Sequence, residues 1–123
     1  ASSKDGYLPR KVINMPVDAE SLVALCAPRP IFIGSGSAEQ GEAWVDPYGQ
    51  YLTCEKAGPV YELLGRKGVV MPDTQTFNGK TVPYPATDKE YLAGDIGYRR
   101  HAGGHQAAPN YPAFIRFIRK YWN

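Results

Sequence analysis

The chain has 123 residues, a length that supports one modest hydrophobic core and at most one domain. Hydrophobic residues make up 43% and charged residues 21%, an ordinary balance for a folded protein that argues against disorder. The net charge of +2 is too small to suggest a nucleic-acid-binding surface, and no apolar segment is long enough to span a membrane.

The first elements are expected in quick succession. Residues 1–17 read as a loop or arm, because prolines interrupt them. Asp18 is a good N-cap for a short helix over Ala19–Ala27. The strand Ile31–Gly34 then follows two prolines. It is apolar throughout, which is typical of a strand buried on both faces of a parallel sheet.

The middle of the chain predicts two short helices and a long loop. The first helix covers roughly Tyr48–Lys56, and Gly58-Pro59 interrupts it. Pro59 suits the first turn of a second helix over Val60–Leu64, which Gly65 closes. Residues 66–94 carry prolines and glycines at intervals and read as a long irregular excursion, a kind of segment that tends to be functional or mobile.

The last third predicts a strand, a glycine-rich loop and a helix. The strand covers Asp95–Arg100, and Asn110 is expected to cap the closing helix Tyr111–Trp122. That helix carries an apolar stripe at helical spacing, formed by Phe114, Phe117, Ile118 and Tyr121. Its basic residues are expected to form a solvated face; they are Arg116, Arg119 and Lys120.

The alternating order of helices and strands predicts the α/β class with a parallel sheet. Two strands do not make a stable sheet alone, so the run Ile31–Gly34 needs neighbours that this sequence does not supply. Residues 1–123 are therefore interpreted as part of one larger domain.

The two cysteines indicate neither a disulfide framework nor a zinc site. Cys26 lies in an apolar run and is expected to be a buried free thiol, whereas Cys54 is expected to be half exposed. A bridge between them stays open at this stage. We expect no metal and no cofactor.

His105 is the strongest candidate for chemistry. A histidine that serves as general base must lie on a loop, with its second nitrogen held by a carboxylate. Gly103 and Gly104 give the backbone the freedom to place it there. The alternative is a surface histidine without a role. His101 would be a zinc partner only on a helix, which the two glycines disfavour, so we interpret it as structural or as a minor part of the pocket wall.

The acids Glu39, Glu42 and Asp46 follow the strand Ile31–Gly34. An acid after one strand and a histidine after a later one matches the α/β-hydrolase order of nucleophile, acid and histidine. Glu39 lies nearest the strand, and Asp46 has an alternative role as a helix cap before Pro47. The chain contains no G-x-S-x-G nucleophile motif.

Trp44 lies between these acids. It either plugs the core beneath the loop or forms a platform for a sugar ring at the mouth of the site.

Several motifs together resemble the C-terminal part of the glucuronoyl esterases of carbohydrate esterase family 15, most closely its bacterial branch. The resemblance begins near Met15 and rests on Pro16–Pro30, Glu42–Gly49, Gly58–Gly65, Gly94–Tyr98 and Gly103-Gly104-His105. It implies the C-terminal portion of an α/β-hydrolase domain, a three-layer sandwich with a mostly parallel sheet.

The same resemblance implies the activity and the site. Members cleave esters between lignin alcohols and the 4-O-methylglucuronic acid of xylan, with a serine nucleophile and an adjacent arginine that assists the oxyanion. By position His105 matches the catalytic histidine, Glu42 matches an acid used by some bacterial members, and Trp44 matches a tryptophan that contacts the uronic acid. Other members place the acid after an earlier strand. The insertion at 77–91 is longer than expected, so the pocket rim is expected to differ.

The nucleophile is accordingly expected in an N-terminal remainder of the hydrolase domain, supplied by a separate chain or by a segment upstream of residue 1. A secreted or periplasmic location is expected for an esterase of glucuronoxylan or lignin–carbohydrate esters. Two other hypotheses stay open: a non-catalytic carbohydrate-binding or scaffold module on a hydrolase-like fold, and an acetyl xylan esterase. A serine in a tight strand-to-helix turn beside an arginine would favour an enzyme.

Overall fold

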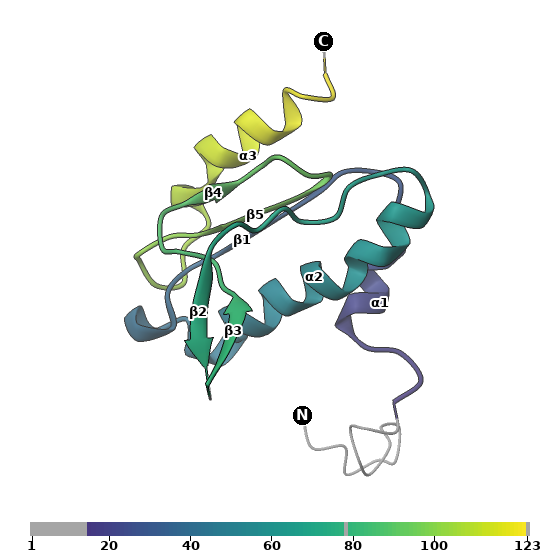
Figure 1. The fold of residues 1–123 in the computed structure, drawn as a ribbon. Helices are drawn as coiled ribbons and strands as arrows, with labels where there is room; N and C mark the ends of the chain where they lie inside the picture. Colours follow the sequence, from purple (N-terminus) through teal and green to yellow (C-terminus); the bar gives the residue numbers. More distant parts are fainter. Residues whose placement is uncertain (1–14, 78, 123) are drawn as a thin grey trace, which may run out of the picture.

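The computed structural model describes residues 15–77 and 79–122. Figure 1 shows three layers, with α3 on one side of a small sheet and α1 and α2 on the other. In chain order the helices and strands are α1 (Ala19–Ala24), β1 (Ile31–Ser35), α2 (Pro47–Leu63), β2 (Thr74–Phe77), β3 (Lys80–Pro83), β4 (Glu90–Tyr91), β5 (Ile96–Arg100) and α3 (Tyr111–Ile118). The predicted α/β class and layered architecture are confirmed. The arm at 1–17 falls almost wholly outside the described residues.

The main sheet has the strand order β1-β5-β4. β1 and β5 run parallel, with Ile31 opposite Ile96 and Ser35 opposite Arg100, so both strands end at the same edge of the sheet. β4 pairs antiparallel with β5. The parallel pair confirms the predicted βαβ arrangement, and it places the loops that follow β1 and β5 side by side.

The expected burial of β1 on both faces is wrong for the described residues. Ile31, Phe32 and Ile33 are only half-buried, and Gly34 is exposed. The reason is the position of β1 at the margin of the sheet, where only β5 pairs with it in the part of the chain that the structure describes. An apolar strand with one open edge is a liability that folded domains usually cover.

The expected break at Gly58-Pro59 is also wrong, because α2 is one helix from Pro47 to Leu63 with Pro59 inside it. Buried side chains continue along the same face on both sides of the proline, at Tyr51, Cys54 and Tyr61. Packing of that face against the sheet outweighs the hydrogen bond that Pro59 removes. Gly65 does close the helix as expected, since the N–H groups of Gly65 and Arg66 donate to the carbonyls of Glu62 and Tyr61.

The predicted irregular excursion at 66–94 contains more structure than expected. β2 and β3 form an antiparallel hairpin, and β4 adds to the main sheet. The sequence Asn78-Gly79 between β2 and β3 is a strong hairpin signal, and Gly79 has a φ of +72°. Figure 1 shows this hairpin extending away from the sheet toward the start of α2.

Both terminal helices are shorter than predicted. The Asp18 carboxylate accepts from the Ala19 N–H at 2.7 Å, which confirms the cap, but α1 ends at Ala24 because a proline follows at position 28. α3 ends at Ile118. Of its predicted stripe, Phe117 is fully buried while Phe114 is exposed. The helix buries Phe117 against Phe32 of β1.

The core between α2 and the sheet is rich in tyrosine, with Tyr51, Tyr61 and Tyr98 almost fully buried. Cys54 also lies there and is completely buried, so the expectation of half exposure is wrong, and burial raises the pKa of its thiol to about 12. Cys26 is half-buried rather than buried, and both thiols are free. Among the described residues no helix has the length and apolar character that crossing a membrane requires.

Candidate active site

Two loops meet beyond the ends of the parallel strands, one after β1 and one after β5. The Ser37 N–H donates to the Gly103 carbonyl at 2.8 Å, and the Ser37 hydroxyl donates to the His101 carbonyl at 2.9 Å. The backbones approach so closely that a Cβ on Gly36 would lie 2.4 Å from the Gly104 oxygen. Glycine is therefore required at this contact, and the two loops pack together as one unit.

This contact brings Glu42 to His105. The His105 Nδ1 and the Glu42 Oε2 are 2.8 Å apart. The Glu42 side chain is 8% exposed, whereas the imidazole is 63% exposed. With Nδ1–H donating to the carboxylate, the neutral ring carries its lone pair on Nε2, and no group in residues 15–77 or 79–122 forms a hydrogen bond to that atom. An oriented imidazole with an accessible Nε2 is the geometry of a general base.

Trp44 lies at the surface of the same unit. Trp44 is 72% exposed, so the interpretation that it plugs the core beneath the loop is wrong. The indole and imidazole ring centroids are 4.8 Å apart, with an interplanar angle of 56°. The indole therefore covers one side of His105 and leaves most of its own surface to solvent, as an aromatic platform requires.

The other two acids lie elsewhere. Glu39 is exposed in the 3-10 turn Ala38–Gln40, and in the described part of the chain it forms no hydrogen bond to His105. Asp46 caps α2, because its Oδ1 accepts the Gly49 N–H at 3.0 Å, as the alternative interpretation predicted. Of the three acids, only Glu42 pairs with the histidine.

His101 is structural, as one of the two sequence interpretations held. It is 2% exposed, and within residues 15–77 and 79–122 its ring bonds only to the loop that carries His105. The described residues contain no group of three potential metal ligands around it or elsewhere.

A small cavity of about 160 Å³ adjoins the pair, lined by Gly34, Glu42, His105, Gln106 and Ala107. A neighbouring apolar hollow of about 270 Å³ shares Gly34 and Ala107 and extends to Phe32 of β1 and Phe114 of α3. The open edge of β1 and the exposed part of α3 thus lead directly to His105.

Neither Ser35, which ends β1, nor Ser37, in the loop after it, is available to His105. The Ser35 hydroxyl donates to the Tyr98 hydroxyl at 2.9 Å, because the single Tyr98 proton is given to the Pro47 carbonyl at 2.9 Å. Burial raises the pKa of Tyr98 to about 12, so this chain of hydroxyls stays neutral. Ser37 donates to His101, as described above. The described residues therefore hold an acid and a base next to a cavity, with no hydroxyl aimed at the base.

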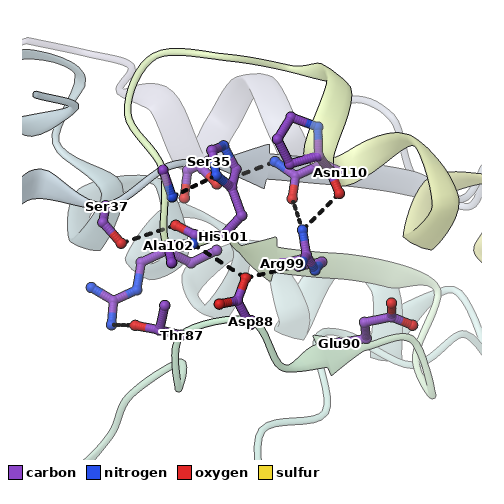
Figure 2. A network of polar contacts seen from close by, with 12 residues as sticks. Ser35, Ser37, Thr87, Asp88, Glu90, Arg99, His101, Ala102 and Asn110 are labelled. Atoms are coloured by element: carbon purple, nitrogen blue, oxygen red, sulfur yellow. Dashed lines mark hydrogen bonds and ion pairs between the residues drawn. The ribbon is translucent and has the colours of Figure 1, made fainter. Parts of the chain in front are cut away.

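A polar network that the sequence did not indicate supports the loops from the other side (Figure 2). Asp88 Oδ1 accepts from the Ala102 N–H at 3.2 Å and from Arg99 at 3.0 Å. Arg99 also donates to Asn110 Oδ1 at 2.9 Å, and Asn110 Nδ2 donates to the Ser35 carbonyl at 3.1 Å. Asn110 precedes α3 without capping it, contrary to expectation, because its side chain is used here.

Comparison with known proteins relates this site to one family. No family model matches the chain. A curated relative, "Carbohydrate esterase MZ0003" from an unknown prokaryotic organism, is 33% identical over 105 residues, which are 85% of this chain and 21% of the relative.

Solved structures agree with that relative. A CE15 glucuronoyl esterase from Teredinibacter turnerae T7901 superimposes with a TM-score of 0.77 at 43% identity, over 94% of this chain and 24% of its own. A promiscuous CE15 esterase from a marine bacterial metagenome gives a TM-score of 0.65 at 33% identity, over 86% of this chain and 23% of its own. The chain thus spans about a quarter of these solved proteins. Sequence and fold together relate it to the CE15 glucuronoyl esterases, as a fragment of their α/β-hydrolase domain.

Proposed function

We propose that this chain supplies the acid and the histidine of a serine carboxylic ester hydrolase. The observation that carries the proposal is the 2.8 Å contact between a buried carboxylate, Glu42, and an exposed imidazole, His105. Its support is the likeness to carbohydrate esterases in sequence and fold. The nucleophilic serine and the arginine that assists the oxyanion belong to the remainder of the hydrolase domain.

The chemistry follows from the geometry of the pair. His105 Nε2 takes the proton of the serine hydroxyl as the serine oxygen attacks the ester carbonyl, and the imidazolium that forms faces the Glu42 carboxylate. The imidazolium then gives the proton to the departing alcohol, leaving an acyl-enzyme. A water molecule repeats the sequence, and the carboxylic acid leaves. Because Glu42 is buried, little water screens its attraction to the imidazolium.

The proposed substrates are glucuronoyl esters between lignin alcohols and the 4-O-methylglucuronic acid of xylan. Trp44 is proposed to bind the uronic acid ring, since its exposed indole lies beside the reacting imidazole. A secreted or periplasmic location goes with this polymeric substrate. Neither the acid–histidine pair nor the serine chemistry needs a metal or an organic cofactor.

The remainder of the hydrolase domain is proposed to pack on the open edge of β1. That edge is apolar and half-buried, and the hollow beside it reaches both Phe32 and His105. The chain spans about a quarter of the solved relatives, so most of such a domain lies outside it.

His105→Ala in the full-length protein tests the proposal. Hydrolysis of a methyl ester of glucuronic acid is expected to fall by at least about 10³-fold, because the variant lacks the imidazole that is proposed to take the serine proton. Retention of most of the activity would refute the assignment. If the natural protein cleaves acetylated xylan but not the glucuronate ester, it is an acetyl xylan esterase. Binding of xylan without any hydrolysis would identify a carbohydrate-binding module.

A further inference from the structure

The His101 ring lies inside the loop that carries His105 and uses both of its nitrogens there. The Gly103 N–H donates to Nδ1 at 2.9 Å, and Nε2 lies 2.9 Å from the Gln106 carbonyl oxygen. These two partners flank His105 in the sequence. The segment forms one internal backbone hydrogen bond, from the Gln106 N–H to the Gly104 carbonyl, and the ring adds two more anchors to it.

The partners determine the protonation state of the ring. Nδ1 accepts a backbone N–H, so it carries a lone pair, and Nε2 carries the proton that it donates to the Gln106 carbonyl. Only the neutral Nε2–H tautomer satisfies both bonds. A hydrocarbon ring of the same size would fill the space and form neither.

The backbone of His101 is held as firmly as its ring. Its N–H donates to the Ser35 carbonyl at 3.0 Å, and its carbonyl accepts from the Ser37 hydroxyl at 2.9 Å. Figure 2 shows His101 between Ser35 and Ser37. Because the backbone of His101 is bonded to the end of β1 and its ring is bonded to the loop, His101 links the position of the loop to that of the strand.

We propose that His101 is a positioning residue for His105: its neutral imidazole holds residues 103–106 so that His105 meets Glu42. The inference rests on the proposed function for its effect on activity, but the loop geometry does not depend on it. Loss of a group that orients a reacting side chain typically lowers activity by about 10- to 100-fold.

Three variants of the full-length protein test this role. His101→Phe keeps a planar ring of somewhat larger volume and removes both bonds. His101→Asn retains an oxygen that accepts the N–H two residues ahead, a common arrangement for asparagine, and loses the bond to Gln106. The matched control is Tyr61→Phe, which removes another buried side-chain hydrogen bond, 2.8 Å to the Arg29 carbonyl in the layer between α2 and the sheet, remote from His105 in the chain.

The expected result separates positioning from stability. His101→Phe lowers kcat on the methyl glucuronate by about 10- to 100-fold with KM within about twofold, and His101→Asn recovers part of the loss. Tyr61→Phe leaves kcat unchanged despite a similar loss of thermal stability. A folded His101→Phe protein with kcat within about twofold of the natural protein would overturn the proposal, as would an equal loss of kcat in Tyr61→Phe.

A spectroscopic readout keeps this test independent of the esterase assignment. In ¹⁵N spectra of the natural protein, we expect His101 as the Nε2–H tautomer and a His105 Nδ1 proton bonded to a carboxylate, with the second signal lost in His101→Phe. Finding the proton of His101 on Nδ1 would overturn the proposal even if His101→Phe fails to fold. If His105→Ala retains esterase activity, the proposed function fails while the spectra still decide the role of His101.

Discussion

Glu42 and His105 differ in exposure, and that difference suits their proposed roles. A buried carboxylate is costly unless it is hydrogen-bonded, and the imidazole Nδ1–H at 2.8 Å supplies such a bond. The exposed imidazole lines the cavity of about 160 Å³, and its second nitrogen has no hydrogen-bond partner among the described residues. At the scale of single residues, the proposed acid is held by its hydrogen bond and the proposed base remains accessible.

Trp44 allows a prediction about substrate binding. Trp44→Ala removes an aromatic contact worth about 0.5–1.5 kcal/mol, so KM for a glucuronate ester is expected to rise about 2- to 10-fold, while Trp44→Phe retains most of the binding. Steady-state kinetics provide the measurement. Because the residue is 72% exposed, the melting temperature should hardly change. An unchanged KM in Trp44→Ala would exclude a platform role.

At the scale of elements, the contact between the two loops sets the distance between acid and base. Gly36→Ala places a Cβ 2.4 Å from the Gly104 oxygen, and that oxygen belongs to backbone that has to move. We expect a loss of about 1–3 kcal/mol of stability, as for an overpacked site. We also expect a 10- to 100-fold loss of kcat, because the loop carrying His105 is displaced.

Gly41→Asn is the matched control for Gly36→Ala. Gly41 lies in the same loop, its φ of +99° is in a region that asparagine enters more readily than most residues, and nothing lies within 4 Å of its added Cβ. Esterase assays and thermal unfolding on both variants make the comparison. Full activity in a folded Gly36→Ala protein would show that the close approach does not control the site.

The sequence predicts the parts of this site that depend on short stretches of the chain. Two strands followed by small residues, with acids after one and a histidine after the other, were enough to select His105 and to leave Glu39, Glu42 and Asp46 as candidate acids. The match of Glu42 to a catalytic acid came from the family resemblance. The structure was needed to choose Glu42 over Glu39, because the turn between the two residues determines which carboxylate faces the imidazole.

Tertiary packing explains what the sequence did not predict. α2 continues through Pro59 because the sheet stabilises its buried face, a fact that local propensity does not contain. Asp88, Arg99 and Asn110 support the loops through contacts between residues 11 to 14 positions apart, without a periodic pattern. The hairpin β2–β3 did have a local signal, Asn78-Gly79. The many prolines and glycines of residues 66–94 favoured an irregular loop instead, so the hairpin was not predicted.

At the scale of the whole molecule, the described residues form a three-layer unit with one open apolar strand edge next to the acid–histidine pair. Both serines near the pair are engaged, Ser35 with Tyr98 and Ser37 with the His101 carbonyl. A catalytic hydroxyl is therefore proposed to arrive with the rest of the domain, along the face that Phe32 and Phe114 leave uncovered.

The most direct test of the central claim compares two acids in one loop. Glu42→Gln and Glu39→Gln remove the same charge, but only Glu42 contacts His105. In the full-length protein, Glu42→Gln is expected to lower kcat/KM for a methyl glucuronate by about 10²- to 10⁴-fold, because the glutamine no longer holds the correct tautomer or stabilises the imidazolium. Glu39→Gln should stay within about twofold. Equal losses in the two variants, or full activity in Glu42→Gln, would contradict the account.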